Sequence, residues 1–217
     1  MNYITRSESI TCIKTALADA NLQALDQTQL GKFEAYLSLL LRWNARTNLT
    51  AVREPSAIVG RHFAECIACA GVLPQDISTL LDFGSGAGFP GIPIALCRPE
   101  ISVTLAESQG KKAAFLSEAV RVLGIAARVH SGRAEALQHE FGCVTLRAVD
   151  RMEAAISAAA RLVRRGGWLA VLTTDPELVN VKTSAGNEFG WQQPMRLPGG
   201  ENRVLALGQR VDSDVSN

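Results

Sequence analysis

The first 78 residues carry apolar side chains at spacings of three and four, which is the pattern of amphipathic helices. Three helices are predicted: one capped by Ser7 or Ser9, a second from about Thr28, and a third from about Pro55, where proline is tolerated in a first turn. This part of the chain is therefore expected to be helical.

Beyond Pro74, short apolar runs alternate with helical stretches. Strands are predicted at 79–83, 102–107, 128–130, 143–146 and 168–172, and helices at 111–123 and 153–164, the second of them ending at Gly166-Gly167. Strands separated by helices indicate βαβ units, and therefore a parallel sheet that is buried on both faces.

The end of the chain has a different pattern. Two apolar stretches, 190–197 and 203–207, flank a Pro-Gly-Gly turn and predict an antiparallel hairpin on the sheet edge. The sequence therefore predicts an α/β protein in two parts, with a helical N-terminal extension over residues 1–73 that packs on a core over residues 74–217.

Composition excludes several classes of protein. Of the 217 residues, 47% are hydrophobic, which argues against disorder, and no apolar run approaches the roughly 18 residues of a membrane span. Five cysteines do not suggest a disulfide framework, so we expect a cytoplasmic protein, and nothing in the sequence demands more than a monomer. A net charge of +1 excludes a chain that is basic throughout, although three stretches (41–61, 111–133 and 147–165) are locally basic.

The strongest candidate for a binding site is the glycine-rich turn after the first predicted strand. Gly84, Ser85, Gly86 and Gly88 lie where glycines let the backbone turn sharply and approach a ligand closely. Glu107 ends the next strand, where a carboxylate can accept hydrogen bonds from both hydroxyls of a ribose. This order of strand, loop and acid indicates a nucleoside site.

The residues after the turn favour a nucleoside without phosphate. A dinucleotide fingerprint requires glycine where Phe89 stands, and Pro90 and Pro93 remove amides that would bind a pyrophosphate. S-adenosylmethionine has no phosphate, and Asp82 at the strand end can attract its ammonium group, directly or through water. We therefore expect S-adenosylmethionine as the cofactor, with NAD as the weaker alternative.

The sequence resembles the RsmG (GidB) family of bacterial 16S ribosomal RNA guanine-N7 methyltransferases over roughly residues 25–210. The segments that carry the resemblance are DFGSGAGFPGIPI (82–94), Glu107-Ser108, KKAAFL (111–116), Trp43-Asn44, NLTA (48–51), His62, Arg133-Ala134-Glu135, Arg147-Ala148 and Leu197-Pro198-Gly199-Gly200. It departs from the family pattern at Leu146 (usually Ser), at Glu65-Cys66 (usually Asp-Ser) and at 173–175, where a Lys-Gly pair is common.

The resemblance implies a class I methyltransferase (Rossmann-like) fold, with a seven-stranded, mostly parallel sheet and an antiparallel last strand. It places the donor-binding residues at Gly84, Ser85, Gly86, Gly88, Phe89, Ala134, Glu135 and Arg147, in addition to Asp82 and Glu107 from the argument above. Candidates for contacts with 16S ribosomal RNA, free or within the small subunit, are Arg46, Asn48, His62, Lys111, Lys112 and Arg147.

The implied reaction needs no general base. Guanine N7 carries an in-plane lone pair, so it can attack a sulfonium methyl without first losing a proton, and the protein has only to align the reacting atoms. No catalytic residue is therefore assigned. Arg147 can bind guanine O6, a phosphate or the carboxylate of the donor, and the sequence leaves these open.

Other functions remain as alternatives. A methyltransferase acting on small molecules is the closest, because residues 1–78 could form its substrate pocket; a non-catalytic RNA-binding protein with the donor fold is another. His62, Cys66 and Cys69 share one face of a helix, but a zinc site usually requires two such pairs, so no metal is expected.

Overall fold

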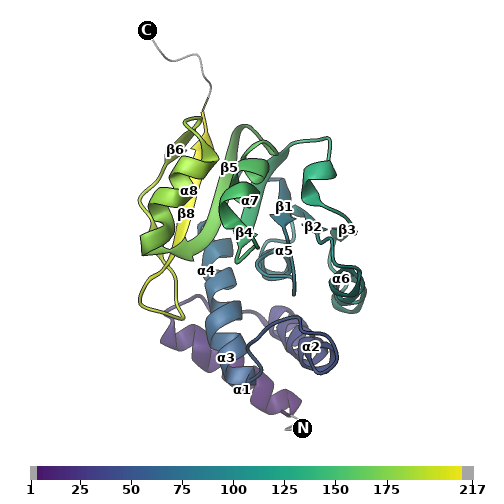
Figure 1. The fold of residues 1–217 in the computed structure, drawn as a ribbon. Coiled ribbons are helices and arrows are strands. Elements are labelled where there is room, and N and C mark those ends of the chain that lie inside the picture. Colours follow the sequence, from purple (N-terminus) through teal and green to yellow (C-terminus); the bar gives the residue numbers. More distant parts are fainter. Residues whose placement is uncertain (1–3, 212–217) are drawn as a thin grey trace.

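A sheet of eight strands forms the centre of the computed structural model, which describes residues 4–211 (Figure 1). Its order is β3-β2-β1-β4-β5-β8-β6, with β7 paired to β8. The strands are β1 (Thr79–Phe83), β2 (Ser102–Ala106), β3 (Ala127–His130), β4 (Phe141–Arg147), β5 (Val163–Thr174), β6 (Phe189–Trp191), β7 (Met195–Arg196) and β8 (Arg203–Arg210).

The directions of the strands confirm the predicted sheet. Strands β1 to β5 pair in parallel, whereas β8 is antiparallel to β5. The predicted terminal hairpin forms in two pieces, because β6 and β7 pair with different halves of β8. The two-residue β7 adds an eighth strand to the predicted seven.

Helices cover both faces of the sheet (Figure 1). They are α1 (Arg6–Asp19), α2 (Gln27–Asn44), α3 (Pro55–Ile58), α4 (Ala64–Val72), α5 (Gly91–Cys97), α6 (Gly110–Leu123), α7 (Met152–Ala160) and α8 (Leu178–Ala185). A π-helical turn, η1 (Val59–Phe63), joins α3 to α4, and short 3-10 turns, η2 (Ala134–Ala136) and η3 (Asp175–Glu177), follow β3 and β5. No helix within residues 4–211 is long and apolar enough to cross a membrane.

Successive side chains of a strand point to opposite faces of the sheet, so the core consists of two clusters, one on each face. Leu80 of β1 faces the cluster that includes α1, α2, α4, α5 and α6, whereas its neighbour Leu81 faces the cluster of α7 and α8. The first cluster runs without a break from Ile13 and Phe33 in the N-terminal helices to Leu105 in the sheet. The N-terminal helices therefore share the core of the sheet. The outermost residues of the two predicted parts, 1–3 and 212–217, lie outside the described residues.

Two predicted boundaries are wrong. Helix α1 is capped by Thr5, not by Ser7 or Ser9, because Thr5 and Glu8 form a reciprocal capping box. Helix α7 ends at Ala160 rather than at Arg164, since Val163 already pairs with Phe141 of β4. The following residues form an irregularity before Trp168 resumes the ladder.

Candidate functional site

The glycine loop follows β1 at the carboxyl edge of the sheet. Gly84, Gly86 and Gly88 have φ angles of 72°, 56° and 92°, a region in which a side chain is strained. The Ser85 amide donates a hydrogen bond to the Ala106 carbonyl of β2 (2.9 Å), which fixes the start of the loop. The turn therefore depends on glycine for its conformation.

Helix α2 supports the same loop from outside the sheet. The buried Tyr36 hydroxyl donates to the Ala87 carbonyl over 2.5 Å, and the Tyr36 ring stacks on Phe63 with centroids 5.3 Å apart. Phe89 packs against both rings. The N-terminal helices therefore help to shape the loop.

Glu107 ties the loop to the end of β2, as the sequence order suggests. One carboxylate oxygen accepts from the Gly86 amide (2.9 Å), and the other accepts from the Gln109 amide (2.7 Å). The side chain is buried, and each oxygen keeps a second lone pair for a ligand hydroxyl. The carboxylate is thus oriented by the backbone before any ligand binds.

A pocket of about 600 Å³ opens beside these residues. Of the predicted donor-binding residues, it is lined by Gly84, Ser85, Gly86, Phe89, Glu107, Ala134, Glu135 and Arg147. The N-terminal part of the chain contributes Leu49, Thr50 and His62 to the wall. The structure therefore brings together residues that are far apart in the sequence.

Two predicted donor-binding residues, Asp82 and Gly88, do not line this pocket. Asp82 is completely buried, and its carboxylate accepts from the Gly91 amide (3.1 Å) and the Thr145 hydroxyl (3.2 Å). Burial raises its pKa to about 6, against the lowering effect of these hydrogen bonds. A Cβ at Gly88 would lie 2.4 Å from Ile92 Cδ1. Asp82 therefore ties the loop to α5, and the space on the Cβ side of Gly88 is filled by Ile92 and Tyr36; contact of either residue with the donor stays a prediction.

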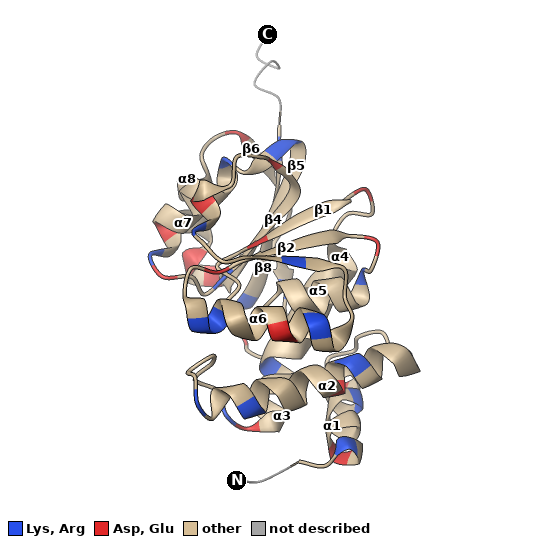
Figure 2. Cartoon of the chain, turned by 90° about the vertical axis from the view of Figure 1, so that its right-hand side faces the viewer, with Lys and Arg blue, Asp and Glu red and all other residues tan. Residues whose placement is uncertain are grey.

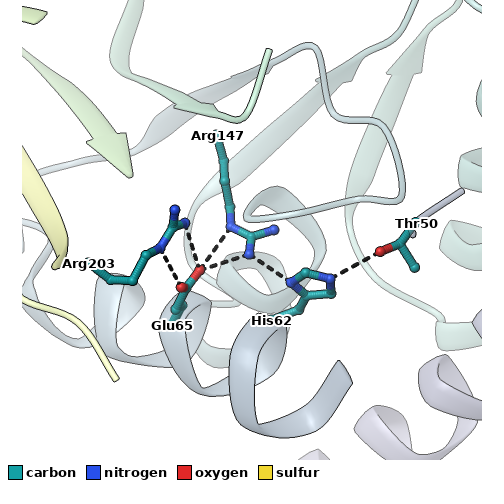
Figure 3. Close-up of polar contacts among 5 residues, drawn as sticks. All are labelled: Thr50, His62, Glu65, Arg147 and Arg203. Carbon is teal, nitrogen blue, oxygen red and sulfur yellow. Dashed lines mark hydrogen bonds and ion pairs between the residues drawn. The ribbon is translucent and has the colours of Figure 1, made fainter. Parts of the chain in front are cut away.

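Five polar side chains form a connected network on one side of the pocket (Figure 3). Arg147, at the end of β4, donates to Glu65 Oε2 from Nε (3.0 Å) and Nη2 (2.8 Å), and Nη2 also donates to His62 Nδ1 (2.7 Å). Arg203 of β8 donates to both Glu65 oxygens, at 2.7 and 3.2 Å. His62 Nε2 lies 3.1 Å from the Thr50 hydroxyl. We call these residues the Glu65 network.

His62 is neutral within this network. Its pKa is lowered to about 3 by burial and by the charges of Arg147, Arg61 and Arg203. A guanidinium can only donate, so Nδ1 is the acceptor and Nε2 carries the proton that is donated to Thr50. Both ring nitrogens are therefore engaged.

Four residues of the loop support and the network were not predicted as site residues: Tyr36, Thr50, Glu65 and Arg203. Tyr36 lies on the apolar stripe of its helix and is indistinguishable there from a core residue. Glu65 could have been found from the sequence, because a single acid within the apolar stretch Phe63–Ala70 indicates a functional or paired residue. Arg203 begins a strand that is distant in the sequence, and only the fold brings it to Glu65.

The candidates for RNA contact divide into two groups. His62, Arg147 and Lys112 line the pocket, whereas Arg46, Asn48 and Lys111 are exposed outside it. The start of α6 and the loop after α2, which carry the exposed candidates, lie on the same side of the molecule (Figure 2). Whether any of them contacts RNA remains a prediction.

The basic stretches converge only in part. Arg133 and Arg151 join Lys112 at the pocket. Arg164 lies at the beginning of β5, and parallel strands place that end of β5 at the sheet edge opposite the pocket. Residues 161–165, the end of the third basic stretch, therefore lie away from the pocket.

A larger groove, of about 1250 Å³, lies between α1, α4 and the segment 195–199. Its lining is mostly small and apolar side chains, and it contains neither the glycine loop nor Glu107. The smaller pocket is the better candidate because it contains the oriented carboxylate and the network.

No group of three His, Cys, Asp or Glu side chains within residues 4–211 could hold a metal ion. The nitrogens of His62 are both engaged, and burial raises the pKa of the Cys66 and Cys69 thiols. These residues therefore contribute to packing and to the network.

Comparison with known proteins gives consistent results. The family described as GidB, rRNA small subunit methyltransferase G, matches residues 29–188. A protein named ribosomal RNA small subunit methyltransferase G from Xanthomonas campestris pv. campestris (strain 8004) is 39% identical over 203 residues, covering 90% of this chain and 94% of that protein. One of the same name from Roseiflexus castenholzii is 39% identical over 200 residues and covers 86% of each.

Solved structures agree on the fold. Cofactor-bound Rv0187 from MTB covers 96% of this chain and 99% of its own, with a TM-score of 0.61 and 19% identity. A SAM-dependent O-methyltransferase from Thermotoga maritima covers 82% of this chain and 73% of its own, with a TM-score of 0.58 and 13% identity. At these identities the likeness concerns the fold alone, and that fold is the class I methyltransferase fold.

Proposed function

Because the chain belongs to the rRNA small subunit methyltransferase G family, we propose that it transfers a methyl group from S-adenosylmethionine to N7 of a guanine in 16S ribosomal RNA. The observation that supports this most strongly is the pocket in which the glycine loop and Glu107 face the Glu65 network. We further propose that the protein acts as a monomer in the cytoplasm, as expected from its sequence.

The pocket fits the donor. Glu107 would bind the ribose hydroxyls through the lone pairs that the amides leave free. A Cβ at Gly86 would meet no atom closer than the Gly84 carbonyl oxygen at 3.9 Å, so the loop presents bare backbone to the ligand there. Ala134 and Glu135, on the short turn after β3, would bound the adenine. The prolines that follow the loop leave few amides for a phosphate, and the donor has none.

When bound, S-adenosylmethionine supplies a methyl group that carries the electrophilic character of a sulfonium. Guanine N7 needs no deprotonation, so the protein has to orient the base and exclude water. His62 supports such a mechanism because neither of its nitrogens is free to accept a proton. Its neutral ring also adds no positive charge beside a base that becomes cationic.

The test is a methyl-transfer assay with labelled S-adenosylmethionine and 16S RNA, either naked or within the small subunit. Cleavage chemistry selective for N7-methylguanine then locates the product. We expect label at one guanine. No label in either RNA, with donor binding intact, contradicts the proposal.

A small-molecule methyltransferase is the second candidate, since Leu49, Thr50 and His62 of the N-terminal part close one wall of the pocket as a substrate cover would. Salt-dependent retention of RNA distinguishes the two, because contacts with phosphates weaken as salt rises. An NAD-dependent enzyme would instead bind NAD in a direct titration against S-adenosylmethionine.

A further inference from the structure

Glu65 is a buried acid that is paired with two arginines. It is completely buried, and it accepts four hydrogen bonds from Arg147 and Arg203. A buried carboxylate is tolerated only when its charge is matched and its lone pairs are used. Its partners come from β4 and β8, and Glu65 itself lies in α4, so one side chain joins three elements.

The contacts leave one edge of Arg147 free. Its Nε and Nη2 are taken by Glu65 and His62, whereas the contacts within residues 4–211 include none to Nη1. Figure 3 shows Nη1 directed away from Glu65. The arginine side chain is only 8% exposed, and its guanidinium carbon lies 5.7 Å from the Phe89 ring centroid. Glu65 and His62 thus hold one edge of the guanidinium, and the edge that carries Nη1 is left for a ligand.

We propose that Glu65 is a positioning residue of the methyl-transfer site: bridged to Arg203, it clamps Arg147 so that Nη1 and the His62 ring present one fixed geometry to the donor and the base. This inference rests on the proposed function. An unrestrained arginine side chain samples many rotamers, and the clamp removes that freedom before substrates bind. A displacement of about 1 Å at such a site can cost roughly 100-fold in rate.

The test compares Glu65→Gln with two other variants. Glutamine has nearly the same shape but no charge, and its amide nitrogen opposes one of the two guanidinium groups. We expect kcat for methyl transfer to fall about 100-fold, with KM for RNA unchanged. Glu65→Asp keeps the charge but shortens the side chain, so its rate should lie between those of Glu65→Gln and the wild type. Ile67→Ala, in the same helix but outside the network, serves as the control for lost stability.

A second measurement separates positioning from general destabilisation. Nitrogen NMR shifts report the His62 tautomer. The chain has two other histidines, His130 and His139, so the His62 signals are identified as those that disappear in His62→Gln. In the wild type we expect Nε2–H, because Arg147 donates to Nδ1. In Glu65→Gln the clamp is lost and the tautomers mix, whereas Ile67→Ala keeps the wild-type signal.

The proposal is overturned if Glu65→Gln keeps the kcat of Ile67→Ala, or if its His62 tautomer equals that of the wild type. Should Glu65→Gln fail to fold, Arg203→Met replaces it, since Glu65 then keeps one partner. That variant should lose roughly tenfold in kcat, and a wild-type rate would overturn the proposal. A wild type that methylates no RNA refutes the proposed function, whereas the tautomer measurement still tests the clamp.

Discussion

At the scale of single residues, the glycine loop and the two acids beside it include residues that line the pocket and residues that stabilise the loop. Gly86 and Glu107 face the pocket, whereas Asp82 and Gly88 hold the loop from behind. The division follows from side-chain direction along β1, since Asp82 lies on the face that packs against α5. An acid in this motif can therefore support the loop without lining the pocket.

Gly86→Asp should abolish binding of S-adenosylmethionine. The carboxylate would extend from the loop into the pocket, because little surrounds the added Cβ, and the left-handed backbone adds a cost of about 1 kcal/mol. Titration calorimetry checks the affinity. Gly71→Asp is the matched control, since Gly71 is exposed in α4 and its Cβ would also meet nothing within 4 Å. Unchanged affinity in Gly86→Asp would show that the loop does not bind the donor.

Asp82→Asn should change how stability depends on pH. The folded pKa of about 6 lies above the ordinary 3.8, so the folded state holds its proton longer than the unfolded state. The contribution of Asp82 to stability is thus fully present below pH 4 and is lost as pH rises through 6, a change on the order of 2–3 kcal/mol. Asparagine does not titrate: its oxygen can accept from the Gly91 amide, and its amide nitrogen can donate to the Thr145 hydroxyl, which reverses that hydrogen bond.

Urea denaturation between pH 4 and 7 measures this effect. Taking the difference in unfolding free energy between the wild type and Asp82→Asn cancels the contributions of the other carboxylates. This difference should fall as pH rises. A constant difference across this range would mean that Asp82 is ionised in the folded state throughout.

At the scale of elements, α2 acts as a support for the glycine loop. It begins at an Asp26 capping box, buries one face in the core, and reaches the loop through Tyr36. Nearer its end, Trp43 donates to Glu118 of α6 over 2.9 Å. The helix therefore connects to the glycine loop and to α6 by separate contacts.

Tyr36→Phe should weaken donor binding as well as stability. The variant leaves the buried Ala87 carbonyl without its partner, at a cost of about 1–3 kcal/mol, and frees the middle of the loop. Trp43→Phe removes a hydrogen bond of the same helix that does not touch the loop. Thermal unfolding and calorimetry together test this: both variants lose stability, and only Tyr36→Phe should lose donor affinity. Equal affinities would contradict a role for α2 in the site.

At the scale of the molecule, the net charge of +1 conceals an uneven distribution. Lys112, Arg133 and Arg151 surround the pocket, and Arg46 and Lys111 lie exposed nearby. Arg121 and Arg128 are exposed on α6 and β3, toward the opposite end of the strands. A basic footprint on this scale matches a structured RNA better than a long naked strand.

Reversing charge near the pocket should weaken RNA binding selectively. The double variant Arg46→Glu with Lys111→Glu should lower the affinity for the small subunit at least tenfold and reduce the salt dependence, without a change in donor affinity. Arg121→Glu with Arg128→Glu makes the same change in net charge at the other edge and serves as the control. Filter binding at several salt concentrations measures both. Equal losses would indicate that only net charge matters.

The sequence alone was sufficient for the parallel sheet, the glycine loop and the acid at the end of β2. These depend on local patterns, namely alternation of apolar residues, glycine where φ is positive, and a strand end that places the acid at a known edge. The predicted end of α7 was wrong because the pairing between β4 and β5 outweighs the helix propensity of residues 161–164.

The Glu65 network and the place of Asp82 were decided only by the tertiary structure. Glu65 meets Arg203 across 138 positions of sequence, and Arg147 across 82. No local pattern encodes such a contact, because it depends on how α4 packs across the ends of β4 and β8. Whether Asp82 faces a ligand or a backbone amide depends likewise on which helix covers β1. The sequence thus determined which residues are chemically available, and the packing of distant elements determined which of them share a pocket.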